Sequence, residues 1–246
     1  MRQTMNVFSL ETGAEILKAL RAPDFIIPTL GMPAAFYSLF AIMLPGSSNN
    51  AAYLLATYGV FGVMAPAIFG FGISVASERD RGWLDLKRAS PSSAVSYIGA
   101  KICSTLIFAS MSLIIIYTIA GFAAGVSLPT GTWAMMLLVH VLATFPFILI
   151  GLSIGFLCNN NAAVAISNVF FLALAALGGL WIPITIFPDA MKMFAMILPS
   201  FHLSEIALHV SGAPGERDIM MNIMAIVAIT FVLLGFTRFA WSRQRS

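Results

Sequence analysis

The sequence predicts an all-α membrane protein with six transmembrane helices, an amphipathic interfacial helix at the N-terminus and a re-entrant outer helical hairpin before the last span. Two features of composition predict this class: 59% of the 246 residues are hydrophobic and only 9% are charged. A soluble domain carries about 25% charged residues, so lipid must solvate much of this chain. The third observation is spacing, because no charged residue occurs from 25 to 77 or from 102 to 188.

Turn-forming clusters divide these apolar stretches into segments of the length that a membrane requires. A helix needs about 20 apolar residues to cross about 30 Å of hydrocarbon. The clusters fall at 45–50, 125–132 and 159–161, and Pro146 is expected to kink one helix. The predicted spans are residues 25–44, 53–76, 102–124, 133–157, 162–184 and 220–241.

The distribution of basic residues predicts the orientation of the spans. Lys and Arg gather on the cytoplasmic side of membrane proteins. With the N-terminus inside, the outer segments contain only Lys192 and Arg217, and the inner segments contain the other 11 of the 13 basic residues. An even number of spans then places both termini in the cytoplasm.

Two segments differ from both spans and ordinary loops. In residues 7–22, Leu10, Leu17 and Leu20 lie on one side of a helix and Glu15 lies elsewhere, which predicts a helix in the cytoplasmic interface. The alternative is a solvated tail. Residues 185–219 contain two apolar stretches that are each too short to cross. Pro199 separates them, so they are expected to enter the outer leaflet and return.

The segment between the second and third spans is the most densely charged part of the chain. Arg81 and Asp85 are spaced i, i+4, and Asp85 and Arg88 are spaced i, i+3, so a short helix is expected. Trp83 gives this helix an apolar anchor, and Pro91 ends it. The alternative interpretation is a basic loop that only fixes the topology.

This segment carries a resemblance to a known family. The run Glu78-Arg79-Asp80-Arg81-Gly82, followed by Asp85 and Pro91, resembles the loop after the second span in type-2 permeases of ATP-binding-cassette exporters. Trp83 stands where that family more often has Thr or Ser, and Asp85 stands where Glu is usual. The later stretch 198–203 (LPSFHL) is similar to the family's segment before its last span. The order of six spans also matches.

The resemblance implies that the charged loop is a coupling helix that docks on a separate cytoplasmic ATPase. It also implies a dimer, formed with a second copy or a related permease, that binds two ATPase subunits in the membrane of a bacterial cell (the inner membrane). On this basis the chain divides into an interfacial helix (1–24) and a permease domain (25–246), with the coupling loop at 77–101. The residues expected at or beside the ATPase contact are Glu78, Arg79, Asp80, Arg81, Gly82, Trp83, Asp85 and Arg88.

The chain is expected to have no ATPase activity, catalytic residue or cofactor of its own. None of its four lysines follows a glycine, so it contains no GxxxxGK[ST] phosphate loop. ATP and Mg²⁺ would therefore be bound by the partner ATPase. The net charge of +3 gives no reason to expect a nucleic-acid partner. The three histidines show no metal-ligand spacing, so no metal site is expected.

Four polar residues in or near the spans are candidates for the substrate pathway. Asn168, with Ser167 beside it, lies in mid-span, where interhelical hydrogen bonding is the alternative. His140 is the only histidine inside a span, and hydrogen-bonded packing is its alternative. Glu205 lies on the outer segment, where it lines an exit or is a paired or solvated carboxylate.

Gly151-Leu152-Ser153-Ile154-Gly155 formally matches the G-x-S-x-G pattern of serine hydrolases. That pattern requires a strand, a turn and a helix, whereas these residues lie inside an apolar helix. The same residues fit GxxxG, as do Gly121 through Gly125, and close helix packing is the interpretation we adopt for both.

Two functions from different classes remain. One is the membrane subunit of an ATP-driven exporter that moves an apolar or amphipathic substrate outward. The other is an ion-coupled carrier or channel that works without an ATPase. Ion-coupled carriers usually place ionisable groups at mid-membrane, and this chain has only His140 there. The sequence favours the exporter and does not distinguish drugs, lipids, glycans and ions as cargo.

Overall fold

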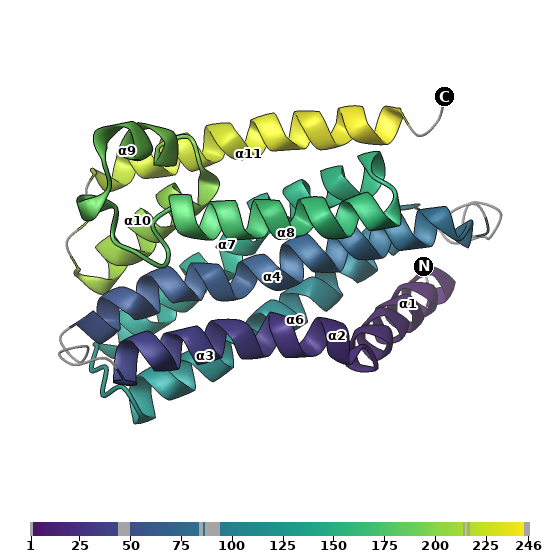
Figure 1. Cartoon of the computed structure of the whole chain (residues 1–246). Coiled ribbons are helices and arrows are strands. Elements are labelled where there is room, and N and C mark those ends of the chain that lie inside the picture. The colour runs from purple at the N-terminus through teal and green to yellow at the C-terminus, as the bar shows by residue number, and fades with distance from the viewer. Residues whose placement is uncertain are drawn as a thin grey trace.

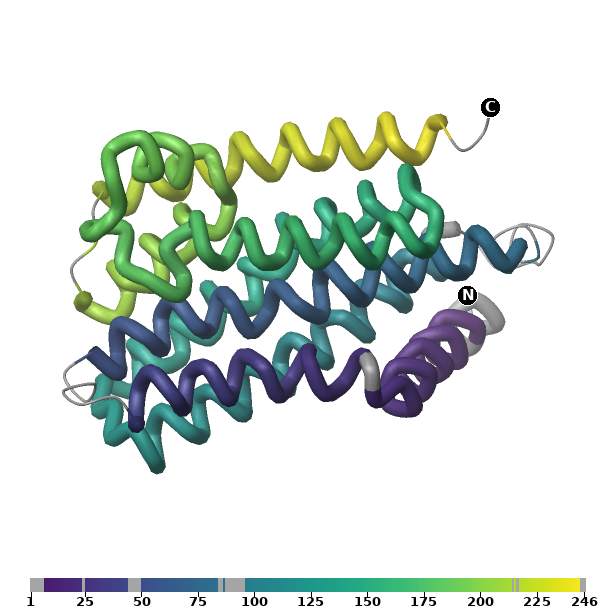
Figure 2. The backbone as a smooth tube through the Cα atoms, in the orientation of Figure 1, coloured from purple at the N-terminus to yellow at the C-terminus, as the bar shows by residue number. Residues whose placement is uncertain are grey.

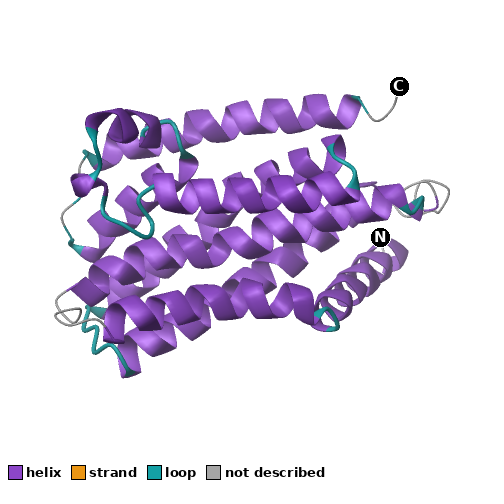
Figure 3. Ribbon diagram, viewed as in Figure 1, coloured by secondary structure: helices purple, strands orange, loops and turns teal. Residues whose placement is uncertain are grey.

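The predicted fold class is confirmed by the computed structural model, which describes residues 2–43, 50–83, 86, 94–213, 215 and 217–243. Within these residues the regular structure is helical, and no strand is formed (Figure 3). Asp85 and Arg88, predicted at the ATPase contact, lie outside the described residues.

The long apolar helices run roughly along one bundle axis, and the first helix lies at an angle to them (Figure 1). In chain order they are α1 (Arg2–Leu20), α2 (Pro23–Ile26), the π-helix η1 (Ile27–Gly31), α3 (Met32–Ser38), the π-helix η2 (Leu39–Met43), α4 (Ala51–Asp80), α6 (Ala94–Phe122), α7 (Thr130–Leu157), α8 (Asn160–Leu177), the 3₁₀-helix η4 (Ile184–Ile186), α9 (Asp189–Ala195), α10 (Pro199–Ser211) and α11 (Ile219–Ser242).

Among the described residues, five helices are long and apolar enough to cross a membrane: α4, α6, α7, α8 and α11. The first predicted span is a continuous helical run from Pro23 to Met43, whose apolar part, Ile27–Met43, is shorter than those five. Pro28 and Pro33 lack the N–H groups of a regular helix, which accounts for π-type bonding around them.

The fifth span ends earlier than the sequence suggests. It was expected to continue to residue 184, but α8 stops at Leu177. Gly179 adopts a left-handed conformation (φ 77°), which ends the helix. The chain then turns through a short irregular segment toward α9.

The segment before the last span forms the predicted bent pair. Helices α9 and α10 meet at 89°, and Pro199 begins α10, as its position in the sequence indicates. Nearly all of α10 is buried, and it packs against α4, α7 and α11, so protein surrounds its backbone. The C-terminal end of α11 lies at the opposite end of the bundle from this pair, together with helix α1 and the Asp80 end of α4 (Figure 2).

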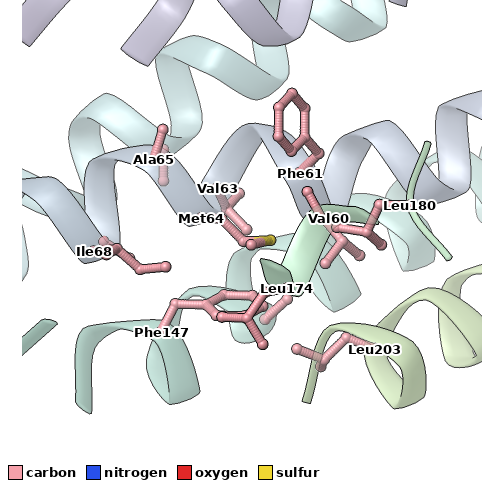
Figure 4. Close-up of a cluster of buried hydrophobic side chains, with 14 of the residues drawn as sticks. Val60, Phe61, Val63, Met64, Ala65, Ile68, Phe147, Leu174, Leu180 and Leu203 are labelled. Atoms are coloured by element: carbon pink, nitrogen blue, oxygen red, sulfur yellow. The ribbon is translucent and has the colours of Figure 1, made fainter. Parts of the chain in front are cut away.

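Helix α4 is the centre of the bundle, and α6, α7, α8 and α10 pack around it. Its apolar side chains meet Phe147 of α7, Leu174 of α8 and Leu203 of α10 (Figure 4). A Cβ at Gly151 would lie 2.7 Å from the carbonyl oxygen of Ala67. The packing interpretation of the GxxxG spacing at Gly151 and Gly155 is therefore confirmed.

The second such spacing was interpreted wrongly. Within the described chain, no atom lies within 4 Å of a Cβ built at Gly121 or Gly125. Gly125 lies beyond the end of α6 and has φ 66°, so it serves a turn and not a helix contact.

Candidate functional site

The last turn of α4 holds a cluster of charged side chains centred on Glu78. This carboxylate accepts hydrogen bonds from Lys18 of α1, from Lys101 of α6 (2.9 Å) and from the Tyr97 hydroxyl. Lys101 also donates to Glu15 of α1, at 2.8 Å. We call these five residues the Glu78 network.

The network is largely buried, apart from the half-exposed Lys18, which makes its pairing structurally important. The side chain of Lys101 is only 3% exposed and that of Glu78 is 12% exposed. A buried charge that loses its partner is strongly destabilising. The network therefore ties the N-terminal helix α1 to α4 and α6 at one end of the bundle.

Arg79 ties α4 to a different neighbour. Its guanidinium donates to the carbonyl oxygens of Gly155 (3.2 Å), Phe156 and Cys158 (2.6 Å). These carbonyls belong to the C-terminal end of α7, where the last carbonyls have no partner within the helix and the helix dipole favours a cation.

Asp80 makes the matching contact with the next helix. Its carboxylate accepts a hydrogen bond of 2.7 Å from the backbone N–H of Asn160, the first residue of α8. A helix N-terminus favours an anion for the same electrostatic reason. Three consecutive residues, 78 to 80, thus connect the end of α4 to four other helices: α1, α6, α7 and α8.

Residues 81 to 83, which follow this group, turn away from the end of α4. Gly82 adopts φ 72°, a left-handed conformation that suits glycine, and turns the chain away from α4. Arg81 is exposed, the Trp83 side chain is 54% exposed, and Leu86 is also exposed. The structure therefore divides the described coupling residues into a group bonded to other helices (78–80) and a following group (81–83) that includes the exposed Arg81 and Trp83.

A cavity of about 540 Å³ lies beside the Glu78 network. Its walls come from α1, from the Pro23–Gly31 segment and from α4, α6 and α8. Lys18, Arg81 and Lys101 line it at the end of α4, and Phe69 and Phe108 line it further along the bundle.

Several uncharged polar groups lie along the cavity. Thr29 is fully buried, and its hydroxyl has no hydrogen-bond partner among the described residues. Ser104 and Thr105 place two further buried hydroxyls on the α6 wall. Asn168, predicted in the substrate pathway, lines the cavity from α8, where its amide nitrogen donates to the carbonyl oxygen of Val164.

The other predicted pathway residues lie elsewhere. Ser167 is fully buried against α4, where a Cβ at Gly72 would be 2.7 Å from its hydroxyl oxygen. Glu205 is buried on α10 and accepts a hydrogen bond from the backbone N–H of Arg217 (3.1 Å), so it is a paired carboxylate.

His140 has the burial and the hydrogen bonds expected of a packing residue. It is fully buried, and its Nε2 bonds the carbonyl oxygen of Ala56 at 2.9 Å while the Tyr117 hydroxyl bonds its Nδ1 at 2.8 Å. Because a carbonyl only accepts, Nε2 carries the hydrogen and Tyr117 donates to Nδ1. Gly59 makes room for the ring, since a Cβ there would lie 2.2 Å from His140 Cε1.

Two further features complete the description. In the described part of the chain, no three His, Cys, Asp or Glu side chains lie close enough together to hold a metal ion. A larger groove of about 1040 Å³ lies between α6, α7, α10 and α11, and its walls are almost entirely apolar.

The sequence analysis did not identify the partners of Glu78 or the cavity hydroxyls. Lys101 was counted only as a topology signal, although a lysine at the start of an 87-residue uncharged stretch needs a partner or water. Ser104 and Thr105, one turn further on, are polar residues of an apolar span and were a usable signal.

Comparison with known proteins shows which sequences this chain is similar to. A family model described as "ABC-2 type transporter" matches residues 7–211. The chain is also 28% identical, over 248 residues, to a protein of Bacillus subtilis (strain 168) named "Putative transport permease YvfS". That match covers 98% of this chain and 100% of the relative.

Proposed function

The chain belongs to the ABC-2 type transporter family, and we propose that it is the membrane permease subunit of an ATP-driven exporter. In this proposal the chain moves an apolar or amphipathic substrate outward. The energy comes from a separate ATP-binding-cassette ATPase, which binds ATP and Mg²⁺. The permease has no catalytic residue of its own.

The connection of the α4 terminus to four helices is the observation that carries this proposal. A force applied to the exposed residues 81–83 reaches α1 and α6 through the Glu78 network, and α7 and α8 through Arg79 and Asp80. Packed helices respond to such a force by rigid-body displacement. Arg81 and Trp83 then contact the ATPase, whereas residues 78 to 80 pass its motion on to the bundle.

A line of packed aromatic rings crosses the apolar core of the bundle. Phe69, on the cavity wall, contacts Phe171, with ring centroids 5.1 Å apart. Phe171 stacks on Phe61 at 5.0 Å, and Phe61 contacts Trp181 at 5.6 Å. The rings therefore lead from the cavity toward the end of the bundle where α9 lies.

The membrane arrangement follows from the same proposal. The Asp80 end of α4 and both termini face the cytoplasm, and α9 and α10 lie at the outer face of a bacterial inner membrane. Two permease chains, identical or related, form the pathway together with two ATPase subunits.

An ion-coupled carrier or channel is the alternative that the described residues support less well. Such a protein needs an ionisable group available at mid-membrane. Among the described residues the buried charges of α4 and α6 lie at one end of the bundle, and both ring nitrogens of His140 are already bonded.

Co-purification in mild detergent tests the proposal. An ATP-binding-cassette subunit is expected to accompany the tagged chain, and Trp83→Ala is expected to reduce its recovery without reducing membrane insertion. Phe122→Ala is the matched control, because Phe122 is an exposed ring at the opposite end of the bundle. Undiminished recovery with Trp83→Ala, or equal loss with both variants, would contradict the assignment.

A further inference from the structure

The cavity beside the Glu78 network has walls of two kinds. Phe25, Phe69 and Phe108 give it an apolar side, which suits a hydrocarbon or aromatic group. Thr29, Ser104 and the other hydroxyl-bearing residues give it a polar side. A ligand that fills this cavity therefore has an apolar part and a hydrogen-bonding part.

The depth of the cavity matches one leaflet of a membrane. On α4 its lining extends from Ser77 to Phe69, which is about 12 Å at 1.5 Å per residue. One leaflet contributes roughly 15 Å of hydrocarbon. Ser77 lies near the end of α4, and Phe69 lies two turns toward the middle of the bundle. The Thr105 hydroxyl oxygen would lie 3.5 Å from a Cβ at Gly70, so a head held there lies nearly two turns from Ser77 toward the middle of the bundle.

Two of the three cations in the cavity wall are paired with carboxylates. Lys101 is paired with Glu15 and Glu78, and Lys18 is paired with Glu78. Arg81 is exposed at the end of α4. A charged ligand head that reached Lys101 would have to separate its buried ion pairs with Glu15 and Glu78, and breaking buried pairs is costly.

The uncharged polar groups, in contrast, are available to a ligand. The hydroxyl of Thr29 is fully buried and has no partner among the described residues, a condition that buried polar groups rarely keep. Asn168 uses its amide nitrogen within α8, which leaves its carbonyl oxygen to accept a hydrogen bond. Ser104 and Thr105 offer hydroxyls that both donate and accept.

We propose that this cavity binds an amphiphile with an uncharged head that carries hydroxyl or amide groups, such as a glycosylated lipid. The hydroxyls of Thr29, Ser104 and Thr105 hold the head, and the three phenylalanine rings hold the apolar part. The chemical class of the ligand is inferred from the cavity lining alone. That the ligand is cargo rests on the proposed export function.

Competition between three lipids with matched acyl chains tests the ligand class on the full-length chain, without an ATPase. The probes are a monoglucosyl-diacylglycerol, phosphatidylglycerol and a trimethylammonium-propane lipid, and native mass spectrometry measures the bound fractions. The glucosyl lipid is expected to bind several-fold more than either charged lipid. Equal binding of the three lipids, or preference for a charged one, overturns the proposal.

Substitutions locate the binding in this cavity. Ser104→Ala and Thr105→Val are each expected to weaken binding of the glucosyl lipid roughly three- to tenfold, the change expected for one lost hydrogen bond. Thr118→Val is the matched control, because Thr118 lies exposed on the same helix, outside the cavity lining, and its hydroxyl bonds the carbonyl oxygen of Ile114. Unchanged binding with both cavity variants overturns the proposal.

A transport experiment distinguishes a ligand that the exporter moves from a lipid that only resides in the cavity. In proteoliposomes containing the permease with its ATPase, ATP-driven outward movement of the glucosyl lipid identifies it as cargo. Binding without movement identifies a resident membrane lipid, and both results support the ligand class. If the three heads bind equally while ATP-driven transport of another substrate persists, this inference fails and the exporter function stands.

Discussion

Removal of the buried cation at position 101 tests whether the Glu78 network holds the bundle together. Lys101→Met keeps the approximate length of the side chain and deletes its charge. The carboxylates of Glu15 and Glu78, now 2.8 and 2.9 Å from the ammonium group, would then face each other in a site from which water is nearly excluded. Glu78 keeps its contacts to Lys18 and Tyr97, but Glu15 loses its ion pair to α6.

The expected loss of stability follows from the burial of the pair. Breaking a buried ion pair by removing one partner costs about 3–5 kcal/mol. For a chain of this size that loss lowers the midpoint of thermal unfolding by roughly 6–20 °C. The measurement is the thermal unfolding of the purified chain in mild detergent, followed by loss of the monodisperse chromatographic peak.

Lys192→Met is the matched control. Its ammonium group lies 4.0 Å from a fully exposed Asp189 carboxylate, and exposed pairs contribute about 0–1 kcal/mol. Adding Glu15→Gln to Lys101→Met should recover part of the loss, because it removes the unpaired carboxylate. If Lys101→Met unfolds within a degree or two of Lys192→Met, the network does not hold α1 to the bundle and the reasoning is refuted.

The remaining predictions concern contacts of α4. Gly59→Ala places a Cβ 2.2 Å from the buried ring of His140, so the free energy of unfolding should fall by about 1–3 kcal/mol. The control Gly235→Ala, at an open position, should change it very little. Equal midpoints of thermal unfolding for the two variants would refute the close approach of Gly59 and His140. Arg79→Gln removes the guanidinium from the end of α7, so ATP-driven transport by the complex should fall at least several-fold while insertion and ATPase recovery persist. Arg243→Gln, which changes an exposed contact with Phe239, is its control, and unchanged transport with Arg79→Gln would contradict the force pathway.

Much of the fold could be predicted because the signals are local in the sequence. Charge-free stretches located the spans, and Pro199 marked the break in the re-entrant pair. The limits of the fifth span were less accurate, because the left-handed turn at Gly179 depends on a glycine in a sequence that also contains helical glycines. The π-type bonding around Pro28 and Pro33 was not foreseen either, since Pro allows several helix distortions.

The site was harder to predict because its geometry depends on contacts distant in the sequence. Glu78, Arg79 and Asp80 are adjacent in the chain, yet their bonded partners on other helices lie between 19 and 80 residues away in the sequence. A charge pattern identifies such residues as important but does not say which of them point inward. The cavity is a similar case, because Thr29, Ser104 and Asn168 come from three spans.

Site-specific photo-cross-linking at Trp83 tests the central claim most directly, namely that the exposed residues after α4 receive the motion of an ATPase. A benzophenone amino acid replaces Trp83 in one variant and Phe122 in another, and both are irradiated in membranes that contain the ATPase subunit. The account predicts an adduct between the Trp83 variant and the ATP-binding-cassette subunit, and none for the Phe122 variant. An adduct at position 122, or none at position 83 while the complex remains assembled, would contradict it.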